Sequence, residues 1–378
     1  MRTHTLKAND VKELTFHLDN LFNKNETFNL AIVFCAPVHD IKQMLHLFDA
    51  HQIDVFGCTT AGEILNNELL DGAITVMLFD VAKDSYAIHL EKNTETILET
   101  AVNTARMAKS CFTHPALIVL SGGVTTDGEE IVQGIKAIIP NSNIPIFGGL
   151  AGDDLAMRKT VVFTSKEICN DGLLTLIFDN NKVEVEGIAA SGWQAIGATN
   201  VVTHALGNIL YSINGEPALD VFTRYFGTHD NAGYGKEVTT ISAQYPLQIA
   251  RRNDYSVMRA PIIANSEDGS LWLAGGVKNG DEFRFSMAPG FETMENTVVE
   301  LGRMQKQTNP AALILFSCVG RRAAFGPMLE DEIGSIYESW NQTPMIGFLT
   351  YGEIGNLRNE QCDFHNETCC LVSIRERA

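Results

Sequence analysis

Short apolar runs and amphipathic segments follow one another along this chain in an order that occurs three times. The first occurrence has an apolar run at 31–35, apolar residues at helical spacing over 40–53, and further apolar runs at 54–56 and 73–79. A short apolar run indicates a buried strand, and apolar residues three and four apart indicate one helix face. The pattern therefore predicts a strand, a helix and two more strands.

The same order returns twice further along the chain, which indicates one supersecondary unit used repeatedly. In the second unit Ile131 and Ile135 mark the helical face, and in the third unit Pro327 stands where a helix is predicted to begin. The strands predicted for the two later units are 116–121, 145–147, 173–178, 311–317, 344–346 and 367–374. Asn180 and Asn181 follow one of these strands and predict a hairpin to the next apolar segment.

The middle strand of each unit ends in a glycine-rich turn with an acid behind it. These turns are GCTTAGEI (57–64), GGLAGDD (148–154) and GFLTYGEIG (347–355). Two strands joined through a helix are parallel, and the strand after the turn can return antiparallel. This predicts an α/β fold of mixed sheets with helices on their faces, built from repeated β-α-β-β units. Ligands usually bind at the carboxyl ends of such strands, so the turns are predicted to lie at a ligand-binding edge.

The segment between the second and third units, 193–309, differs from both. It contains short apolar stretches separated by turn signals and predicts strands and hairpins, with a helix that begins at Pro217 and another over 289–309. The second unit ends near 189–192, and no low-complexity linker follows it. We therefore expect two closely packed domains, residues 1–190 with two units and residues 191–378 with the β-rich segment and the third unit.

Charge and composition exclude several classes of partner. Of 378 residues, 45% are hydrophobic and 20% charged, and the net charge of −18 repels phosphate, which argues against nucleic acid and anionic membranes. No apolar run approaches the length of a membrane helix, and the N-terminus has no signal-peptide pattern. Eight cysteines without CxxC spacing are typical of reduced thiols, so we expect a cytoplasmic protein.

The chain has no phosphate loop, metalloprotease motif or nucleophile elbow, and we predict no catalytic residues. Polar side chains instead gather at the predicted strand edge and in one further strand. These ligand-binding candidates are Thr59, Thr60, Glu63, Asp153, Arg259, Arg321, Arg322, Tyr351 and Glu353. Two interpretations stay open. The acids bind a ligand or satisfy the backbone of their own turns, and the arginines bind a ligand carboxylate or form internal ion pairs.

Several of these segments together resemble one family. VFGCTTAGEI (55–64), FGGLAGDD (147–154), VMRAP (257–261), FSCVGRR (316–322) and GFLTYGEIG with FHNET (364–368) resemble, in this order, bacterial proteins with FIST N and FIST C sensory domains. The resemblance covers nearly the whole chain. It implies a cytosolic sensor that binds a small molecule and regulates a signalling partner, either a histidine kinase or a component of a cyclic-di-GMP pathway.

The resemblance extends to a stand-alone subset of haem proteins that sense nitric oxide, which implies haem b as a cofactor. A haem ligand must be a histidine or thiolate that faces an apolar pocket. His39 at the predicted ligand edge and His204 beside the domain junction are the candidate axial ligands, with His229 next. His365, in FHNET, is expected to belong to the general pocket instead. The alternative is a sensor of amino acids or other small carboxylates without haem.

An enzyme is the competing class of function. Cys35, Cys58 or Cys318 would be its nucleophile, and Cys318 has Arg321 and Arg322 close by in sequence. A reactive cysteine needs a lowered pKa beside a cation, and the sequence shows no nearby base.

Overall fold

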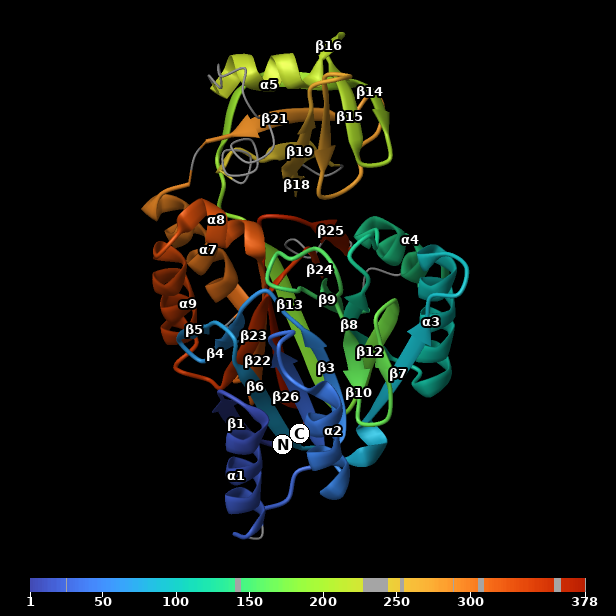
Figure 1. The fold of residues 1–378 in the computed structure, drawn as a ribbon, viewed down its shortest axis with the longest axis vertical. Helices are drawn as coiled ribbons and strands as arrows, with labels where there is room; N and C mark the ends of the chain where they lie inside the picture. Colours follow the sequence, from blue (N-terminus) through green and yellow to red (C-terminus); the bar gives the residue numbers. More distant parts are fainter. Residues whose placement is uncertain are drawn as a thin grey trace.

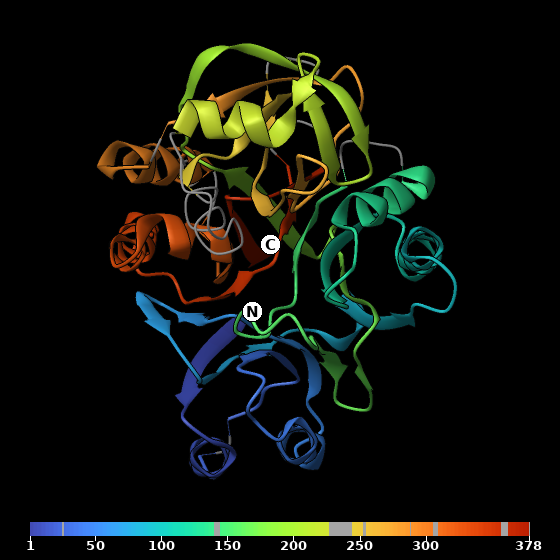
Figure 2. The ribbon, with the colours of Figure 1, turned by 45° about the horizontal axis from the view of Figure 1, so that its top comes forward.

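Three mixed sheets surround a common centre, and a fourth sheet lies at one end of the molecule (Figures 1 and 2). The computed structural model describes residues 1–24, 26–139, 144–226, 244–251, 255–287, 289–304, 309–356 and 362–377. Helices cover the outside of the three sheets, and both chain ends lie near one another (Figure 1). We call the part built from the three sheets the three-unit body.

The first sheet is built mainly from residues 2–80. Parallel strands β2 and β3 are joined through α2, and β6 returns antiparallel to β2. Its strands are, in order, β1 (Arg2–Ala8), β6 (Ile74–Asp80), β2 (Leu30–Cys35), β3 (Asp54–Thr59), β10 (Val162–Thr164) and β11 (Ile168–Cys169). Its helices are α1 (Val11–Phe22) and α2 (Ile41–Ala50).

The second sheet repeats this arrangement, with β8 and β9 parallel and β12 antiparallel to β8. Its strands are β25 (Asp363–His365), β24 (Glu353–Gly355), β9 (Ile146–Leu150), β8 (Pro115–Gly122), β12 (Gly172–Asp179) and β7 (Tyr86–Lys92). A 3-10 turn, Lys83–Ser85, precedes β7. The helices of the second unit are α3 (Ile97–Cys111) and α4 (Gly128–Ile138).

The third sheet is the third copy, with β22 and β23 parallel and β26 antiparallel to β22. Its strands are β13 (Val183–Ala190), β26 (Cys369–Glu376), β22 (Ala312–Cys318), β23 (Met345–Thr350), β4 (Glu63–Leu65) and β5 (Glu68–Leu70). Its helices are α7 (Phe291–Gly302), α8 (Val319–Phe325) and α9 (Met328–Ser339). The predicted α/β class and its repeated unit are thereby confirmed.

The fourth sheet and α5 form the β-rich domain, residues 195–286. Its antiparallel strands enclose a hydrophobic cluster of their own, in which Phe222 of α5 packs near Phe285. The strands are β18 (Ser256–Arg259), β17 (Leu247–Ala250), β21 (Glu282–Ser286), β14 (Ala195–Leu206), β15 (Ile209–Ile213), β20 (Ser270–Leu273) and β19 (Pro261–Asn265), with β16 (Glu216–Pro217) beside β15. The helix is α5 (Ala218–Phe226).

The inner faces of the three sheets share one core. Phe34 of β2, Phe147 of β9 and Phe348 of β23 belong to one buried cluster, with the rings of Phe34 and Phe348 4.6 Å apart. The outer faces pack on helices, so β2 and β8 are buried along their whole length. Strands buried on both faces read as continuous apolar runs, which is why the runs were visible in the sequence.

Each glycine turn carries the chain from its own sheet into a neighbouring one. The hairpin after the first turn, β4–β5, pairs with β23 of the third sheet. The hairpin after the second turn, β10–β11, pairs with β3 of the first sheet, and β24–β25 after the third turn pairs with β9 of the second. The three units thus exchange hairpins in a closed ring.

The three turns meet at the centre of this ring through equivalent backbone hydrogen bonds. The N–H of Ala61 donates to the carbonyl of Leu349 (3.2 Å), Tyr351 to Leu150 (3.1 Å), and Gly152 to Thr59 (2.9 Å). A Cβ on Gly152 would lie 2.6 Å from the Ala61 nitrogen, so the close approach requires glycine there. Gly152 of the second glycine turn thus lets its backbone approach the backbone of the first turn.

The structure differs from the sequence-based expectation at the segment around residues 180–190. The hairpin predicted at Asn180 and Asn181 is wrong, because β12 pairs with β7 and β8 whereas β13 pairs with β26 in another sheet. Strands from both sides of residue 190 also share sheets. The division into residues 1–190 and 191–378 stays a prediction about sequence modules, and the spatial division is between the three-unit body and the β-rich domain.

Candidate functional site

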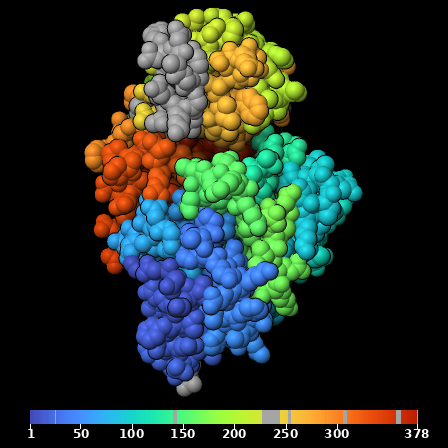
Figure 3. Space-filling model, viewed as in Figure 1, coloured from blue at the N-terminus to red at the C-terminus, as the bar shows by residue number. Residues whose placement is uncertain are grey.

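A cavity of about 460 Å³ lies between the three-unit body and the β-rich domain. The two parts are visible as separate masses in Figure 3, with a recess between them. The body contributes the loop after β8 (123–127), the junction of β22 with α8 (318–320), Tyr351 of the third glycine turn, and residues 366–367. The β-rich domain contributes Asn208 and the segments 260–262 and 273–276. We call this cavity the interdomain cleft.

The segments 123–127 and 318–320 lie at the carboxyl ends of β8 and β22, where ligand sites are expected in such sheets. At this edge Asp127 caps α4 by accepting from the N–H of Glu129 at 2.8 Å. Most of the remaining wall is apolar and includes Leu150, Ile262 and Leu273. The cleft therefore combines an apolar wall with a small number of polar groups, as small-molecule sites usually do.

Two polar side chains at the cleft have buried oxygens with no partner among the described residues. They are Oδ1 of Asn366 and Oε2 of Glu367, and both side chains belong to residues only 1% exposed. Glu367 has a left-handed backbone (φ 54°), which is uncommon for a residue other than glycine. Burial raises the pKa of Glu367 to about 8, against the lowering effect of Arg321. At neutral pH this carboxyl is mostly protonated.

Tyr351 connects the cleft to the loop at 153–160. Its hydroxyl donates to Oδ1 of Asp153 at 2.5 Å and accepts from the backbone N–H groups of Leu155 (2.8 Å) and Asp153 (3.1 Å). The Asp153 carboxylate also accepts from three consecutive N–H groups, those of residues 157–159. The loop is thus wound around Asp153, and Leu155 and Met157 line the cleft.

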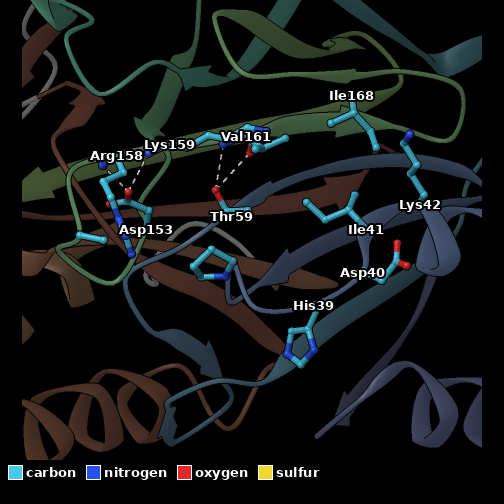
Figure 4. A pocket seen from close by; sticks show the side chains of 12 residues that line it. His39, Asp40, Ile41, Lys42, Thr59, Asp153, Arg158, Lys159, Val161 and Ile168 are labelled. Atoms are coloured by element: carbon cyan, nitrogen blue, oxygen red, sulfur yellow. Dashed lines mark hydrogen bonds between the residues drawn. The ribbon is translucent and has the colours of Figure 1, made fainter.

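A second pocket of about 550 Å³ is lined in part by residues of the same loop (Figure 4). Thr59 and Asp153 line it together with His39 and the start of α2. The Thr59 hydroxyl accepts from the N–H of Val161 at 2.9 Å, and His39 Nε2 lies 3.0 Å from the carbonyl of Gly72. The polar groups named here therefore have partners within the protein.

Thr60 with Glu63 and Thr350 with Glu353 form equivalent buried pairs in the first and third units. In each pair the threonine hydroxyl donates to the glutamate, and a backbone N–H, of Ala73 or Thr368, donates to the other carboxylate oxygen. Burial raises the pKa of both carboxyls to about 7, more than these hydrogen bonds lower it. Each carboxylate thus has partners within the protein, a hydroxyl of its own turn and a backbone N–H of another segment, which agrees with a structural role for these two acids.

The three candidate arginines all have internal ion pairs. Arg321, fully buried, binds Glu332 through Nε and Nη2 and stacks near the rings of Trp193 and Phe325. Arg259 binds Glu129 of α4, and Arg322 binds Asp71 at the surface. None of the three lines the interdomain cleft.

The predicted site residues are therefore distributed over several places. Tyr351 lines the interdomain cleft, Thr59 and Asp153 line the second pocket, and Thr60, Glu63 and Glu353 are buried in their turns. His365 is buried with Nε2 3.0 Å from the carbonyl of Gly355, and burial lowers its pKa to about 4. That these residues bind a ligand stays a prediction.

The surroundings of the candidate haem ligands do not suit haem. His39 is bonded to Gly72 beside an open pocket, and His204 is exposed and stacks on Tyr211 with ring centroids 4.8 Å apart. No histidine is among the described residues that line the interdomain cleft. His229 lies outside the described residues. Within the described ranges no group of three or more His, Cys, Asp or Glu is arranged to hold a metal ion.

The thiols of the enzyme hypothesis are all buried. Burial raises the pKa of Cys35, Cys58 and Cys318 above the ordinary value of a thiol, so these groups stay protonated. Cys318 lies at the cleft, but no cation lowers its pKa. These three cysteines therefore supply no activated nucleophile.

Sequence reasoning missed Asn366 and Glu367 as site residues, although both stand in FHNET. The available signal was their position directly after His365, in a short polar run between two apolar segments. It also missed the contribution of β19 and β20, because nothing local in those strands indicates which face meets the body.

Comparisons with known proteins agree with this architecture. A FIST N domain is matched over residues 29–216 and a FIST C domain over residues 218–356. An uncharacterized protein of Methanocaldococcus jannaschii is 22% identical over 375 residues, which span 89% of this chain and 71% of that protein.

Two mycobacterial relatives, each described only as an uncharacterized protein, are similar over shorter stretches. One, of Mycobacterium bovis, is 23% identical over 57% of this chain and 58% of its own length. One, of Mycobacterium tuberculosis, is 20% identical over 64% of this chain and 63% of its own length. Among the described residues every helix is too short or too polar to span a bilayer. With both of its domains matched in succession, the chain belongs to the FIST family, whose domains are the sensory parts of signalling proteins.

Proposed function

We propose that this protein is a sensor in which a small ligand binds the interdomain cleft and changes the contact between the three-unit body and the β-rich domain. A signalling protein, such as a histidine kinase or a component of a cyclic-di-GMP pathway, then reads that change. The observation that carries the proposal is the cleft itself, because each of its walls comes from a different part of the molecule. A ligand that contacts both walls binds one relative arrangement more tightly than others, and so shifts the population toward it.

Among the described residues, specific polar contacts link the two parts beside the cleft. Arg259 of β18 donates to the carbonyl of Phe364 (3.1 Å) and binds Glu129 of α4, and Tyr255 donates to Asp363 at 2.6 Å. These contacts lie next to residues 260–262 of the cleft wall. A ligand bound at that wall therefore lies next to the strand whose arginine holds the two parts together.

A sensor of this type is tested by a ligand screen on the full chain. Saturation-transfer NMR with small amines, alcohols and carboxylic acids detects binders, and Ala323→Trp, which places an indole at the cleft, is expected to abolish their binding. Ala50→Trp, an exposed alanine at the end of α2, is the matched control. Small-angle scattering with a binder is expected to show a changed radius of gyration. Absence of any binder that Ala323→Trp displaces would contradict the proposal.

Haem sensing of nitric oxide remains a separate hypothesis, and we route no step of the proposed function through haem. The described surroundings of His39 and His204 do not favour it. A Soret band in the purified protein would reopen it.

A further inference from the structure

Two residues of the interdomain cleft wall carry buried side-chain oxygens that no described residue satisfies. Oε2 of Glu367 and Oδ1 of Asn366 are buried, adjacent in sequence and part of the same wall. Buried polar atoms without partners cost free energy, and in native proteins each one calls for an explanation, such as a water or a ligand. Asn366 Nδ2 donates to the carbonyl of His365, which leaves its oxygen as the free group.

Glu367 has an unfavourable backbone conformation and a tightly packed side chain. Its backbone is left-handed, and its carboxyl packs so closely on Gly320 that a Cβ there would lie 2.0 Å from Oε1. Its own carbonyl is held by Nη1 of Arg321 at 2.9 Å. A strained residue held by its surroundings and carrying an unpaired polar atom is typical of a ligand-contacting position.

The two buried arginines near the cleft already form ion pairs within the protein. Arg321 binds Glu332 and Arg259 binds Glu129, and neither lines the cleft. Among the described residues of the cleft wall there is no Lys, Arg or His, whereas Asp127 and Glu367 are acids. A ligand carboxylate would find no cationic side chain here, and a ligand cation would find two oxygens.

We propose that the cleft ligand is an organic amine with an apolar body, whose ammonium group donates hydrogen bonds to Glu367 and Asn366. This inference rests on the proposed function and names the chemical class of its ligand. The apolar body lies against Leu150, Leu155, Met157 and Ile262, which face the same cavity. Charge-assisted hydrogen bonds of this kind are the strong ones in protein recognition.

Binding of such a ligand is coupled to a proton. Burial keeps Glu367 mostly protonated at neutral pH in the empty cleft. The arriving ammonium favours the carboxylate, so the carboxyl proton leaves to the buffer while the amine keeps its own proton. The bound state is a carboxylate–ammonium pair, so amine binding near pH 7 is expected to release protons to the buffer.

Matched ligands separate this inference from the sensor function on which it rests. Sets of amine, alcohol and carboxylic acid on the same apolar body, for instance phenethylamine, 2-phenylethanol and 3-phenylpropionate, are titrated calorimetrically into the full chain at pH 7. The amine of a set is expected to bind at least about tenfold more tightly than the alcohol, with the acid weakest, as charge-assisted hydrogen bonding requires. Buffers of different ionisation enthalpy are expected to reveal the released proton.

Substitutions of Glu367 and Asn366 test whether these two residues bind the ammonium group. Glu367→Gln is expected to weaken amine binding at least about tenfold, to leave alcohol binding unchanged and to abolish proton release. Asn366→Ser, which also removes the amide oxygen, is a second and milder variant. Glu295→Gln, at an exposed glutamate of α7, is the control. Melting temperatures confirm that each variant is folded.

The outcomes are distinct. If acids or alcohols bind in a manner that Ala323→Trp abolishes and amines do not, the ligand class is wrong and the sensor function stands. If amines bind with unchanged affinity in the folded Glu367→Gln and Asn366→Ser variants, the assignment of these two residues is wrong. If no member of any set binds, the sensor function itself fails and this inference falls with it.

Discussion

Arg259 of the β-rich domain reaches into the three-unit body and binds Glu129 of α4, where it is almost completely buried. The same guanidinium donates to the carbonyls of Gly276 (3.0 Å) and Phe364 (3.1 Å). One side chain thus joins both walls of the interdomain cleft. The sequence VMRAP (257–261) alone does not distinguish this ion pair from a ligand-binding role of Arg259.

Loss of Glu129 is expected to weaken this junction. Glu129→Gln leaves the guanidinium of Arg259 buried without its counterion, and breaking a buried ion pair costs about 3–5 kcal/mol. Because Glu129 itself is partly exposed, we expect the lower end of that range. Urea unfolding followed by circular dichroism measures the change. Glu130→Gln, at the next residue of α4, is the control and is expected to leave the midpoint unchanged.

The central contact between glycine turns gives a second prediction. A Cβ on Gly152 would lie 2.6 Å from the Ala61 nitrogen and 2.8 Å from the Thr60 carbonyl carbon, and backbone atoms cannot move aside cheaply. Gly152→Ala is therefore expected to destabilise the fold by about 1–3 kcal/mol, the cost of overpacking. Equal stability of this variant and the wild type would mean that the turns do not meet as described.

Gly334 provides a matched control for that experiment. It lies inside α9, and a Cβ there meets nothing within 4 Å. Gly334→Ala is expected to stabilise the helix by up to about 1 kcal/mol, because alanine loses less backbone entropy. The two substitutions are chemically identical and are expected to shift the unfolding midpoint in opposite directions.

The repeated units could be predicted from the sequence because their strands are buried on both faces. Continuous apolar runs such as 31–35 and 311–317 are local signals, and glycine marks the turns between them. The exchange of hairpins could not be predicted, because pairing of Ile64 with Gly347 joins segments that are remote along the chain. The same holds for β13, which follows a good hairpin signal and yet pairs with β26.

The candidate site was predicted less well for a related reason. Acids after glycine turns look alike in sequence. Glu63 and Glu353 each accept from a threonine hydroxyl of their own turn and from a backbone N–H of another segment, whereas Glu367 keeps an unpaired oxygen. That difference depends on whether a hydroxyl or N–H from another segment reaches the carboxylate. Of the residues predicted from the sequence to bind a ligand, only Tyr351 lines the interdomain cleft.

The buried carboxyl of Glu353 predicts how stability depends on pH. Burial raises the pKa of Glu353 from its ordinary value of 4.5 to about 7, so the folded protein favours the protonated form. Its contribution to stability is fully present below about pH 4.5 and is lost as the pH rises through about 7, because the unfolded chain ionises first. We expect Glu353→Gln to remove this loss.

The geometry of the site makes glutamine a suitable replacement. Its oxygen can accept from the N–H of Thr368 while its amide donates to the Thr350 hydroxyl, which can reverse its own role. Unfolding midpoints of wild type and Glu353→Gln are compared from pH 5 to pH 8.5. Parallel curves over this range would show that Glu353 does not carry the expected titration, and Glu63→Gln then tests the equivalent group.

The last prediction concerns Arg321, for which ligand binding and an internal ion pair were both open. Arg321→Met leaves Glu332 buried and unpaired and is expected to destabilise the protein by about 3–5 kcal/mol. Arg321→Met with Glu332→Gln removes both charges, and replacing a whole buried pair by neutral groups of similar size is often nearly neutral. The double variant is therefore expected to regain much of the lost stability. The double variant also lacks the contact from Arg321 Nη1 to the carbonyl of Glu367, so it is expected to bind the cleft ligands found by the screen, with at most a small loss of affinity. Complete loss of binding in a double variant whose unfolding midpoint has recovered would instead return Arg321 to the binding site.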